Sequence, residues 1–293
     1  MHRLLVVVFL TACHGVASEA PDASADAPGS TWQPLVTRSW NLAPSQQAYQ
    51  CRRIQAATDM WISGFRELSP LGTHHVVLSV STATNTGDYD CDPNALVNEM
   101  QMLYGAGIHT DDLAFPPGVA VHVRAGQYLT LQLHLFNTGD ESLAGESGVL
   151  VQQIAPESVA HEASMTFGGT IAIDLPPDSQ PHTAQGGCTI DRDMHVVALF
   201  PHMHQLGIQQ KLVLSSAGTV TTLFDAPFTF GEQRNVPIAD TLFRAGDRVD
   251  VTCTYINTTS QRVHYGNSST EEMCFTGIYA YPPLSSLYGC VSL

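Results

Sequence analysis

The residues of this chain best suited to chemistry are its histidines, which number 13 against only 12 Lys and Arg together. His202 and His204 stand in the run Phe-Pro-His-Met-His-Gln-Leu-Gly. Residues two apart on a strand point to the same side, so both imidazoles can reach one metal ion. A His-x-His pair alone is weak evidence, because two surface histidines on a strand would look the same.

A second histidine lies in a strongly patterned segment. In the run 129–135 every odd position is Leu and packs one way, whereas Thr130, Gln132 and His134 share the other face. That polar face either lines a site or simply faces solvent.

Two further histidines, His74 and His75, are adjacent in Gly-Thr-His-His-Val-Val. In a regular strand their side chains would point to opposite sides. Joint coordination of one metal therefore requires irregular pleating, which the start of a strand just after Gly72 allows.

Met273 precedes Cys274 in Glu-Glu-Met-Cys. The usual role of methionine is to fill a core. As a ligand its thioether is soft and favours Cu(I) over zinc, calcium or magnesium. Imidazoles with one thioether and no spare thiolate indicate copper, although not a blue-copper centre, which needs a free cysteine.

The pattern of the chain predicts an all-β protein. Alternating or β-branched runs are separated by turn residues such as Gly, Pro, Asn and Asp, which is typical of sandwiches or barrels. A weakly patterned polar segment at 155–163 places a domain boundary near residue 160. The predicted strands are 75–80, 119–123, 129–135, 149–154, 170–173, 195–200, 211–214, 219–223 and 248–255, and one helix is predicted at 93–103.

The N-terminus has the pattern of an export signal. Arg3 precedes a short apolar run that ends in Leu-Thr-Ala-Cys13, too short to span a bilayer. This ending resembles the lipobox of bacterial lipoproteins, in which the cysteine is acylated; an ordinary signal peptide with a chance cysteine is the alternative. His14 rather than Asp after Cys13 predicts anchoring at the outer membrane, with membrane contact through this lipid only.

The organisation predicted from these features has four parts. Residues 1–12 form a signal peptide, and residues 13–31, rich in Ala, Ser, Asp and Pro, form a tether. Residues 32–160 and 161–293 form two domains. The formal net charge of −15 argues against nucleic acid as a partner.

Six cysteines remain when Cys13 is set aside for lipid: Cys51, Cys91, Cys188, Cys253, Cys274 and Cys290. An even number in an exported protein predicts disulfides, with 15 possible connectivities. No Cys-x-x-Cys is present, which argues against a thiolate zinc site.

Taken in order, these motifs resemble the copper type II ascorbate-dependent monooxygenases, the family of peptidylglycine α-hydroxylating monooxygenase and dopamine β-monooxygenase. The resemblance runs from about Tyr49 to Tyr288. It rests on Thr73-His-His, Leu131-Gln-Leu-His, His202-Met-His-Gln-Leu-Gly, Glu271-Glu-Met-Cys and Tyr279-Ala-Tyr-Pro.

The resemblance implies two antiparallel, jelly-roll-like β-sandwich domains packed side by side, with two coppers facing each other across a wet cleft. His74, His75 and His134 would hold the copper that receives electrons from ascorbate. His202, His204 and Met273 would hold the copper at which dioxygen reacts with a small organic substrate. The resemblance also implies that Cys253 pairs with Cys274 and Cys188 with Cys290, which leaves Cys51 with Cys91.

The sequence departs from the family at the substrate site. The peptide-amidating member holds its substrate with an arginine, an asparagine and a tyrosine, where this chain has Phe200, Phe275 and Gly277. A glycine-extended peptide is therefore a poor candidate, and the pocket should be more apolar.

Three functions are compatible with these motifs. The first is a monooxygenase that hydroxylates a C–H bond of a small molecule with dioxygen and an ascorbate-type donor. The second is a copper-binding or sequestering lipoprotein without turnover. The third is a β-sandwich lipoprotein whose histidines are structural.

Overall fold

The computed structural model describes residues 31–92, 101–108, 110–284 and 286–292. Nearly all regular structure in these ranges is β-strand, which confirms the predicted all-β class. The segments predicted as signal peptide and tether, including Cys13, lie outside the described residues except for Thr31. In the part that is described, no helix has the length and apolarity needed to cross a membrane.

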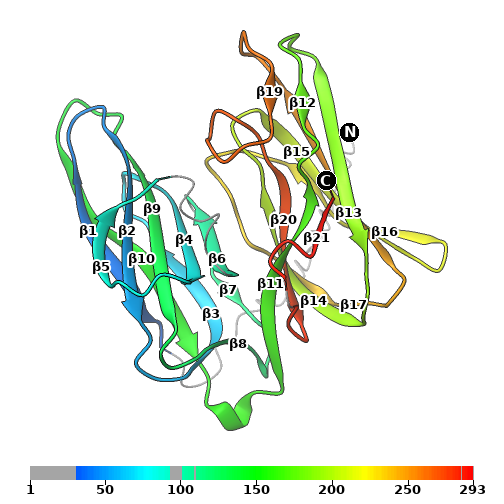
Figure 1. The fold of residues 1–293 in the computed structure, drawn as a ribbon, viewed down its shortest axis with the longest axis horizontal. Coiled ribbons are helices and arrows are strands. Elements are labelled where there is room, and N and C mark those ends of the chain that lie inside the picture. Colours follow the sequence, from blue (N-terminus) through cyan, green and yellow to red (C-terminus); the bar gives the residue numbers. More distant parts are fainter. Residues whose placement is uncertain (1–30, 93–100, 109, 285, 293) are drawn as a thin grey trace, which may run out of the picture. The chain divides into compact units, whose positions relative to one another are not determined.

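The N-terminal half is a sandwich of two sheets (Figure 1). One sheet has the order β5 (Gly87–Asp90), β2 (Gln47–Gln55), β9 (Tyr128–Phe136), β4 (Thr73–Ser81) and β6 (Gln101–Gly107). The other has the order β1 (Gln33–Leu42), β10 (Leu143–Gln153), β3 (Met60–Leu68) and β8 (Val119–Val123), with β7 (Leu113–Ala114) beside β3.

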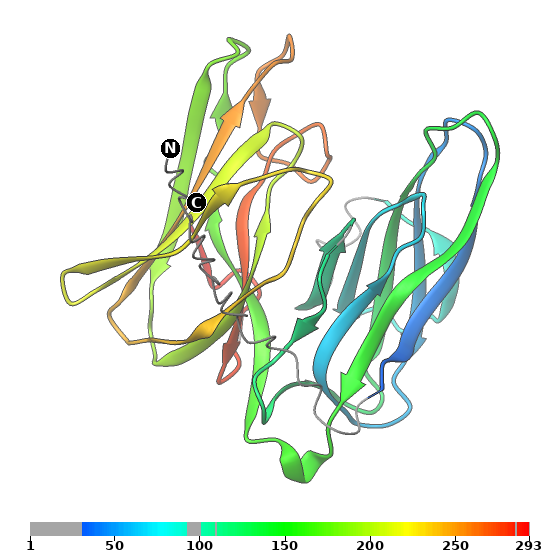
Figure 2. The same ribbon diagram turned by 180° about the vertical axis from the view of Figure 1, so that it is seen from behind.

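The C-terminal half repeats this arrangement (Figure 2). Its first sheet has the order β11 (His161–Thr170), β20 (Cys274–Tyr281), β14 (Met194–His202) and β17 (Val236–Phe243), and β21 (Cys290–Ser292) runs parallel to β11. The second has the order β13 (Pro181–Thr189), β18 (Arg248–Ile256), β15 (Gly207–Ser216) and β16 (Thr219–Pro227). The short strands β12 (Asp174–Leu175) and β19 (Val263–His264) pair separately.

The two halves share one continuous sheet. The 3₁₀ turn η2 (Pro156–Ser158) follows β10, and β11 then pairs in parallel with β8, with His161 opposite Val119. The strand order β1-β10-β3-β8-β11-β20-β14-β17 therefore passes from one sandwich into the other. Backbone hydrogen bonds tie the halves together, in addition to side-chain packing.

Strand β20 belongs to both cores. Cys274, Ile278 and Ala280 pack into the core of the C-terminal sandwich, whereas Phe275 and Tyr279 pack with residues of the N-terminal half. Every residue of β20 is buried, as expected of a strand covered on both faces. Its position is therefore fixed from two sides.

Two sequence-based predictions are wrong in part. The helix predicted at 93–103 lies mostly outside the described residues, but its described end, 101–103, opens β6. The strand predicted at 170–173 overlaps β11 only at Thr170, where that strand ends. The remaining predicted runs lie in β4, β8, β9, β10, β14, β15, β16 and β18, apart from residue 154, which follows the end of β10.

Three disulfides join the pairs that the family resemblance implies: Cys51–Cys91, Cys188–Cys290 and Cys253–Cys274. The first lies in the N-terminal sandwich and connects β2 to the segment after β5. The third connects β18 to the first residue of β20. Met273, directly before Cys274, is therefore attached to a strand whose place is fixed.

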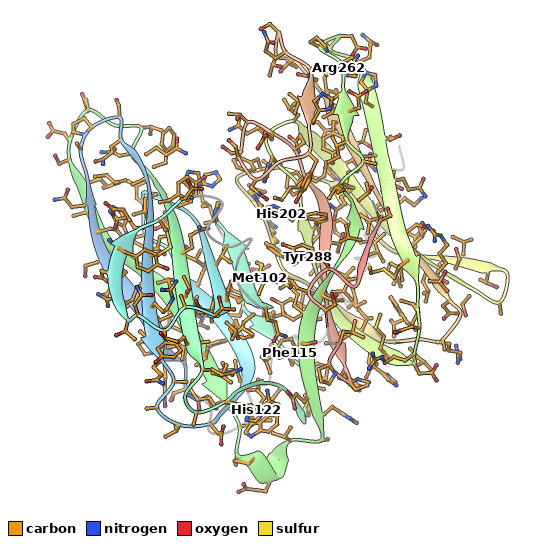
Figure 3. The ribbon with its side chains drawn as sticks, viewed as in Figure 1. Met102, Phe115, His122, His202, Arg262 and Tyr288 are labelled. Carbon is orange, nitrogen blue, oxygen red and sulfur yellow. A yellow bond between two sulfur atoms is a disulfide. The ribbon has the colours of Figure 1, made fainter. Side chains whose placement is uncertain are left out.

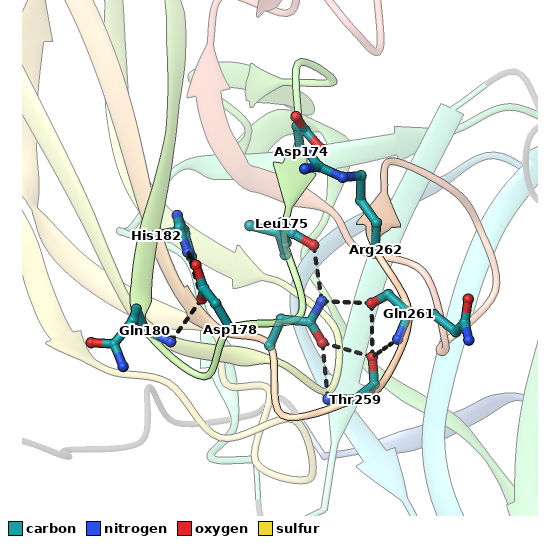
Figure 4. Close-up of polar contacts among 9 residues, drawn as sticks. Asp174, Leu175, Asp178, Gln180, His182, Thr259, Gln261 and Arg262 are labelled. Carbon is teal, nitrogen blue, oxygen red and sulfur yellow. Dashed lines mark hydrogen bonds and ion pairs between the residues drawn. The ribbon is translucent and has the colours of Figure 1, made fainter.

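Each half also has a buried asparagine just beyond a central strand. After β18, Asn257 donates to the carbonyls of Leu175 at 2.9 Å and Gln261 at 2.8 Å, and its oxygen accepts from the Thr259 amide (Figure 4). After β9, Asn137 donates to Ala43 and to Glu141 in the same way. These side chains satisfy loop carbonyls that would otherwise be buried without a donor.

A partly buried carboxyl makes the stability of the N-terminal half depend on pH. Glu67 on β3 accepts from the Thr110 amide at 3.2 Å, while its other oxygen is buried without a partner. Burial raises the pKa of Glu67 to about 7 from its usual 4.5. The folded chain therefore binds this proton more tightly than the unfolded chain, so the stabilisation is complete below the unfolded pKa and is lost as the pH rises through about 7.

We expect the stability of the Glu67→Gln variant not to fall as the pH rises through about 7. Between about pH 5 and about pH 8 the free energy of unfolding of the parent should fall relative to the variant, by at most about 3 kcal/mol. Urea unfolding at several pH values measures this difference. Glu157→Gln, at an exposed position in η2, serves as the control and should follow the parent. Parallel curves for Glu67→Gln and the parent would contradict the expectation.

Candidate metal centre

The first histidine set is assembled by an irregularity in β4. Its pairing with β9 shifts between Thr73, opposite Leu135, and His75, opposite His134. His74 is thus the extra residue, and both adjacent imidazoles turn toward the same place. Their Nδ1 atoms lie 3.2 Å apart. The ligand atoms of His74, His75 and His134 all lie within 4.8 Å of one another.

His134 is held in a defined orientation. Its Nε2 lies 2.6 Å from the amide of Gln47, and its ring stacks on Tyr49 with centroids 4.3 Å apart. Its Nδ1 is buried and has no hydrogen-bond partner. A buried nitrogen without a partner is costly. A metal ion bound at Nδ1 would satisfy it, with the Gln47 amide turned so that its oxygen accepts from Nε2–H.

The polar face of β9 proves to be buried rather than solvent-facing. Thr130 and Gln132 are each 1% exposed and His134 is 4% exposed. Burial lowers the pKa of His134 to about 3 and lowers the pKa of His74; burial, then the neighbouring histidines, hold that of His75 well below 6.5. All three imidazoles are neutral at pH 7, which is the form that binds metals.

The second set lies where β14 ends. His202 Nδ1 is 2.6 Å from Gln233 Oε1, and His204 Nδ1 is 3.0 Å from the carbonyl of Glu271. Each Nδ1–H therefore donates to oxygen, and each Nε2 keeps a free lone pair for a metal. Burial lowers the pKa of His202 to about 3 and that of His204 to about 4.

A buried glutamate connects this turn to the methionine segment. Glu272 is fully buried, and its carboxylate accepts from the amides of His204 at 2.9 Å, Leu206 at 2.6 Å and Met273 at 3.3 Å. Burial raises the pKa of Glu272 to about 7, against the opposing effect of these three donors. Glu272 thereby holds His204 and Met273 in one arrangement.

The intervening methionine has a different role. Met203 is fully buried in the core of the C-terminal sandwich, and a Cβ at Gly207 would lie 2.6 Å from its Cε. Met273 instead lines a cavity together with His202 and His204. Of the two methionines, only Met273 opens onto the space that the histidines share.

That cavity has a volume of about 130 Å³ and receives side chains from both halves, including Met102, His202 and Tyr288 (Figure 3). His75 lines it on the N-terminal side. Phe230 stands between the two histidine sets, with its ring centroid 4.7 Å from that of His74 and 6.1 Å from that of His204. The space between the sets therefore contains an aromatic ring, where the family resemblance implied a wet cleft.

Hydrogen bonds from β6 and the residues after it hold the segment that carries Phe230 and Gln233. The amides of Gly107 and Ile108 donate to the carbonyls of Gln233, at 2.9 Å, and Gly231, at 3.1 Å. The Asn235 side chain donates to the Gly105 carbonyl at 2.8 Å. Through Gln233, the orientation of His202 depends on contacts with the other half of the molecule.

Sequence reasoning missed the residues that orient these ligands: Gln47, Phe230, Gln233 and Glu272. Glu272 stands within the Glu-Glu-Met-Cys motif, so its place beside Met273 was a usable signal. Phe230 and Gln233 lie in a loop without periodicity, and nothing in the sequence associates them with a histidine. Only the fold brings them to the site.

The second half of the chain matches a known family model. Residues 162–293 match the family model described as the C-terminal domain of copper type II ascorbate-dependent monooxygenases. The match includes His202, His204 and Met273, whereas His74, His75 and His134 lie outside it.

Other similarities are partial. A stretch of 110 residues is 32% identical to the phosphatidylglycerol–prolipoprotein diacylglyceryl transferase of Rhodopirellula baltica, over 33% of this chain and 22% of the transferase. The chain thus spans far less than two thirds of that relative. Among solved structures, the infectious bursal disease virus Gx strain and the VP2 subviral particle of that virus are 11% and 10% identical, each with a TM-score of 0.19. They cover 87% and 88% of this chain, and it covers 73% of each.

The side chains present fit copper. Both sets offer neutral imidazoles, and the second adds the soft thioether of Met273, which suits Cu(I). The buried free nitrogen of His134 and the lone pairs that hydrogen bonding leaves at His202 and His204 are the atoms such an ion requires.

We expect Glu272→Gln to weaken metal binding at the second set alone. An amide has one oxygen where the carboxylate has two, so at least one backbone donor loses its acceptor and the turn loosens. Loss of such an orienting contact costs about 10-fold to 100-fold in metal affinity. Titration with Cu(I) against a competing chelator measures the affinity of each site.

The matched control is Glu271→Gln, because that neighbouring side chain is exposed while its backbone carbonyl still accepts from His204. It should bind copper like the parent. Equal affinities in Glu272→Gln and Glu271→Gln would show that the carboxylate of Glu272 does not position the ligands.

Proposed function

We propose that the chain is a copper-dependent monooxygenase that hydroxylates a C–H bond of a small organic substrate, using dioxygen and an ascorbate-type one-electron donor. The observation that carries the proposal is one cavity lined by His75 of the first histidine set and by His202, His204 and Met273 of the second. The family match over residues 162–293 supports it independently.

In this proposal His74, His75 and His134 hold one copper, and His202, His204 and Met273 hold the other. Copper supplies the one-electron chemistry that activates dioxygen. The second set has three protein ligands, which leaves room for a further ligand on the cavity side. Its thioether favours the reduced ion, whereas the all-imidazole set suits either oxidation state.

The protein's own contribution is orientation and exclusion of water. Gln233 and the Glu271 carbonyl fix the imidazoles of His202 and His204, and Glu272 fixes their distance from Met273. Phe200, Phe230 and Phe275 line the cavity. Their rings keep bulk water from the C–H bond, which limits side reactions of reactive species.

The same cavity favours an enzyme over a copper carrier. A protein that only stores copper has no need of a space for an organic molecule beside its ligands. The cavity borders His202, His204 and Met273, where a monooxygenase would place its substrate.

The first test of the proposal is metal stoichiometry. The parent should bind two coppers and consume oxygen when ascorbate is supplied with a substrate. His134→Ala should bind one copper fewer and keep the other, because the second ligand set lies apart from β9. Metal analysis combined with an oxygen electrode measures both properties.

The control for this test is His264→Ala, which removes an exposed histidine that belongs to neither set. It should leave stoichiometry and oxygen consumption unchanged. Saturation of the parent at one copper, or a preference for zinc under reducing conditions, would contradict the proposal. Two coppers without turnover would indicate a carrier.

We also propose that the chain is exported and anchored through lipid on Cys13 to the bacterial outer membrane, on the basis of the Leu-Thr-Ala-Cys sequence. The mature chain should begin at Cys13 and carry diacylglycerol. Mass spectrometry of the native N-terminus tests this. An unmodified N-terminus beyond residue 13 would refute the anchor.

A further inference from the structure

We infer that the substrate of this site is an uncharged molecule that carries a single aromatic ring. Its status as a substrate rests on the proposed monooxygenase function, but its binding does not.

The described residues that line the cavity include no Asp, Glu, Lys or Arg. Three histidines contribute to the lining, namely His75, His202 and His204. No side chain of the lining offers a carboxylate or an ammonium group an opposite charge to replace its lost hydration, which is costly. The lining therefore selects against both kinds of ion.

Two of the polar side chains in the lining are already engaged. Gln132 donates to the Asp92 carbonyl at 3.2 Å. Gln233 accepts from His202 and donates to the Phe230 carbonyl at 3.1 Å. Asn267 and Ser269 add uncharged polar atoms to the lining. At most, the site offers hydrogen bonds to a neutral polar substituent.

The shape of the cavity suits one ring. An engineered apolar cavity of about 150 Å³ is known to take up benzene, and this cavity measures about 130 Å³. Three of its side chains form a triangle of rings, with centroids 5.8 Å apart for Phe167–Phe275, 5.8 Å for Phe167–Tyr288 and 6.0 Å for Phe275–Tyr288. Aromatic rings favour such separations, so a further ring in the cavity can pack against this cluster.

Phe200 is the side chain that sets this specificity. Two glycines make room for it. A Cβ at Gly105 on β6 would lie 3.0 Å from Phe200 Cζ, and a Cβ at Gly277 on β20 would lie 3.1 Å from Phe200 Cβ. The ring is thus held at the junction of β6, β14 and β20, and it is only 4% exposed. A cationic side chain at this position would reverse the preference of the cavity for an uncharged ligand over a carboxylate.

The test compares three probes that share a phenyl ring: ethylbenzene, 2-phenylethylamine and 3-phenylpropionate. Ligand-observed NMR on the full chain, with and without copper, gives their dissociation constants. Ethylbenzene should bind more tightly than both ions by about 10-fold or more. Equal or tighter binding of either ion, or no binding of ethylbenzene up to its solubility limit, would overturn the inference.

Two variants assign the preference to Phe200. Phe200→Arg should weaken binding of ethylbenzene and strengthen binding of 3-phenylpropionate, so that their order reverses. Phe200→Leu stays apolar and should preserve the order of the three probes even if Phe200→Arg fails to fold. Val220→Arg, at a position 66% exposed on β16, adds the same charge remote from the cavity lining and should change nothing.

Binding is measured without turnover, so the two proposals can fail separately. Selective binding of ethylbenzene without ascorbate-driven oxygen consumption would refute the monooxygenase proposal and leave the inference about the cavity intact. Oxygen consumption that is supported best by 2-phenylethylamine or 3-phenylpropionate would confirm the enzyme and overturn the inference.

Discussion

The packing of β20 on both of its faces is the constraint on which the site depends. One set of its side chains fills the C-terminal core and the alternate set fills the space toward the N-terminal sandwich. Tyr279 is fully buried and donates to the Leu103 carbonyl of β6 at 3.2 Å, so the contact is polar as well as apolar. Because Met273 directly precedes this strand, the position of its thioether is set by both halves at once.

The histidines of both sets are held in defined orientations by contacts within the protein. A bulge turns His74 beside His75, Gln47 and Tyr49 fix the ring of His134, and backbone or amide oxygens fix the second pair. Such contacts remove rotamer freedom before any ion arrives, which lowers the entropic cost of binding. That cost is met during folding instead, because His134 and His204 are buried as neutral imidazoles.

The sequence predicted the parts of this site that follow from alternation within one strand. The Leu positions of β9 place His134 on the opposite face, and the spacing of His202 and His204 places Met203 between them in the core. Alternation does not reveal what covers a face, so solvent exposure remained open for β9. The helix predicted at 93–103 is wrong where β6 begins, because pairing with β4 outweighs local helix preference there. Phe230 and Gln233 are joined to the histidines only by long-range contacts, which no local pattern encodes.

The buried asparagines Asn137 and Asn257, which make matching hydrogen bonds, allow the two halves to be aligned with each other. Asn137 follows β9 as Asn257 follows β18, and each donates to the carbonyl four residues later. In this alignment His134, three residues before Asn137, corresponds to Thr254, three residues before Asn257. The first half borders the cavity with the sheet that contains β9, whereas the second uses the sheet that lacks β18. The two histidine sets therefore lie at different positions within one shared strand plan, so repetition of the fold does not repeat the histidines.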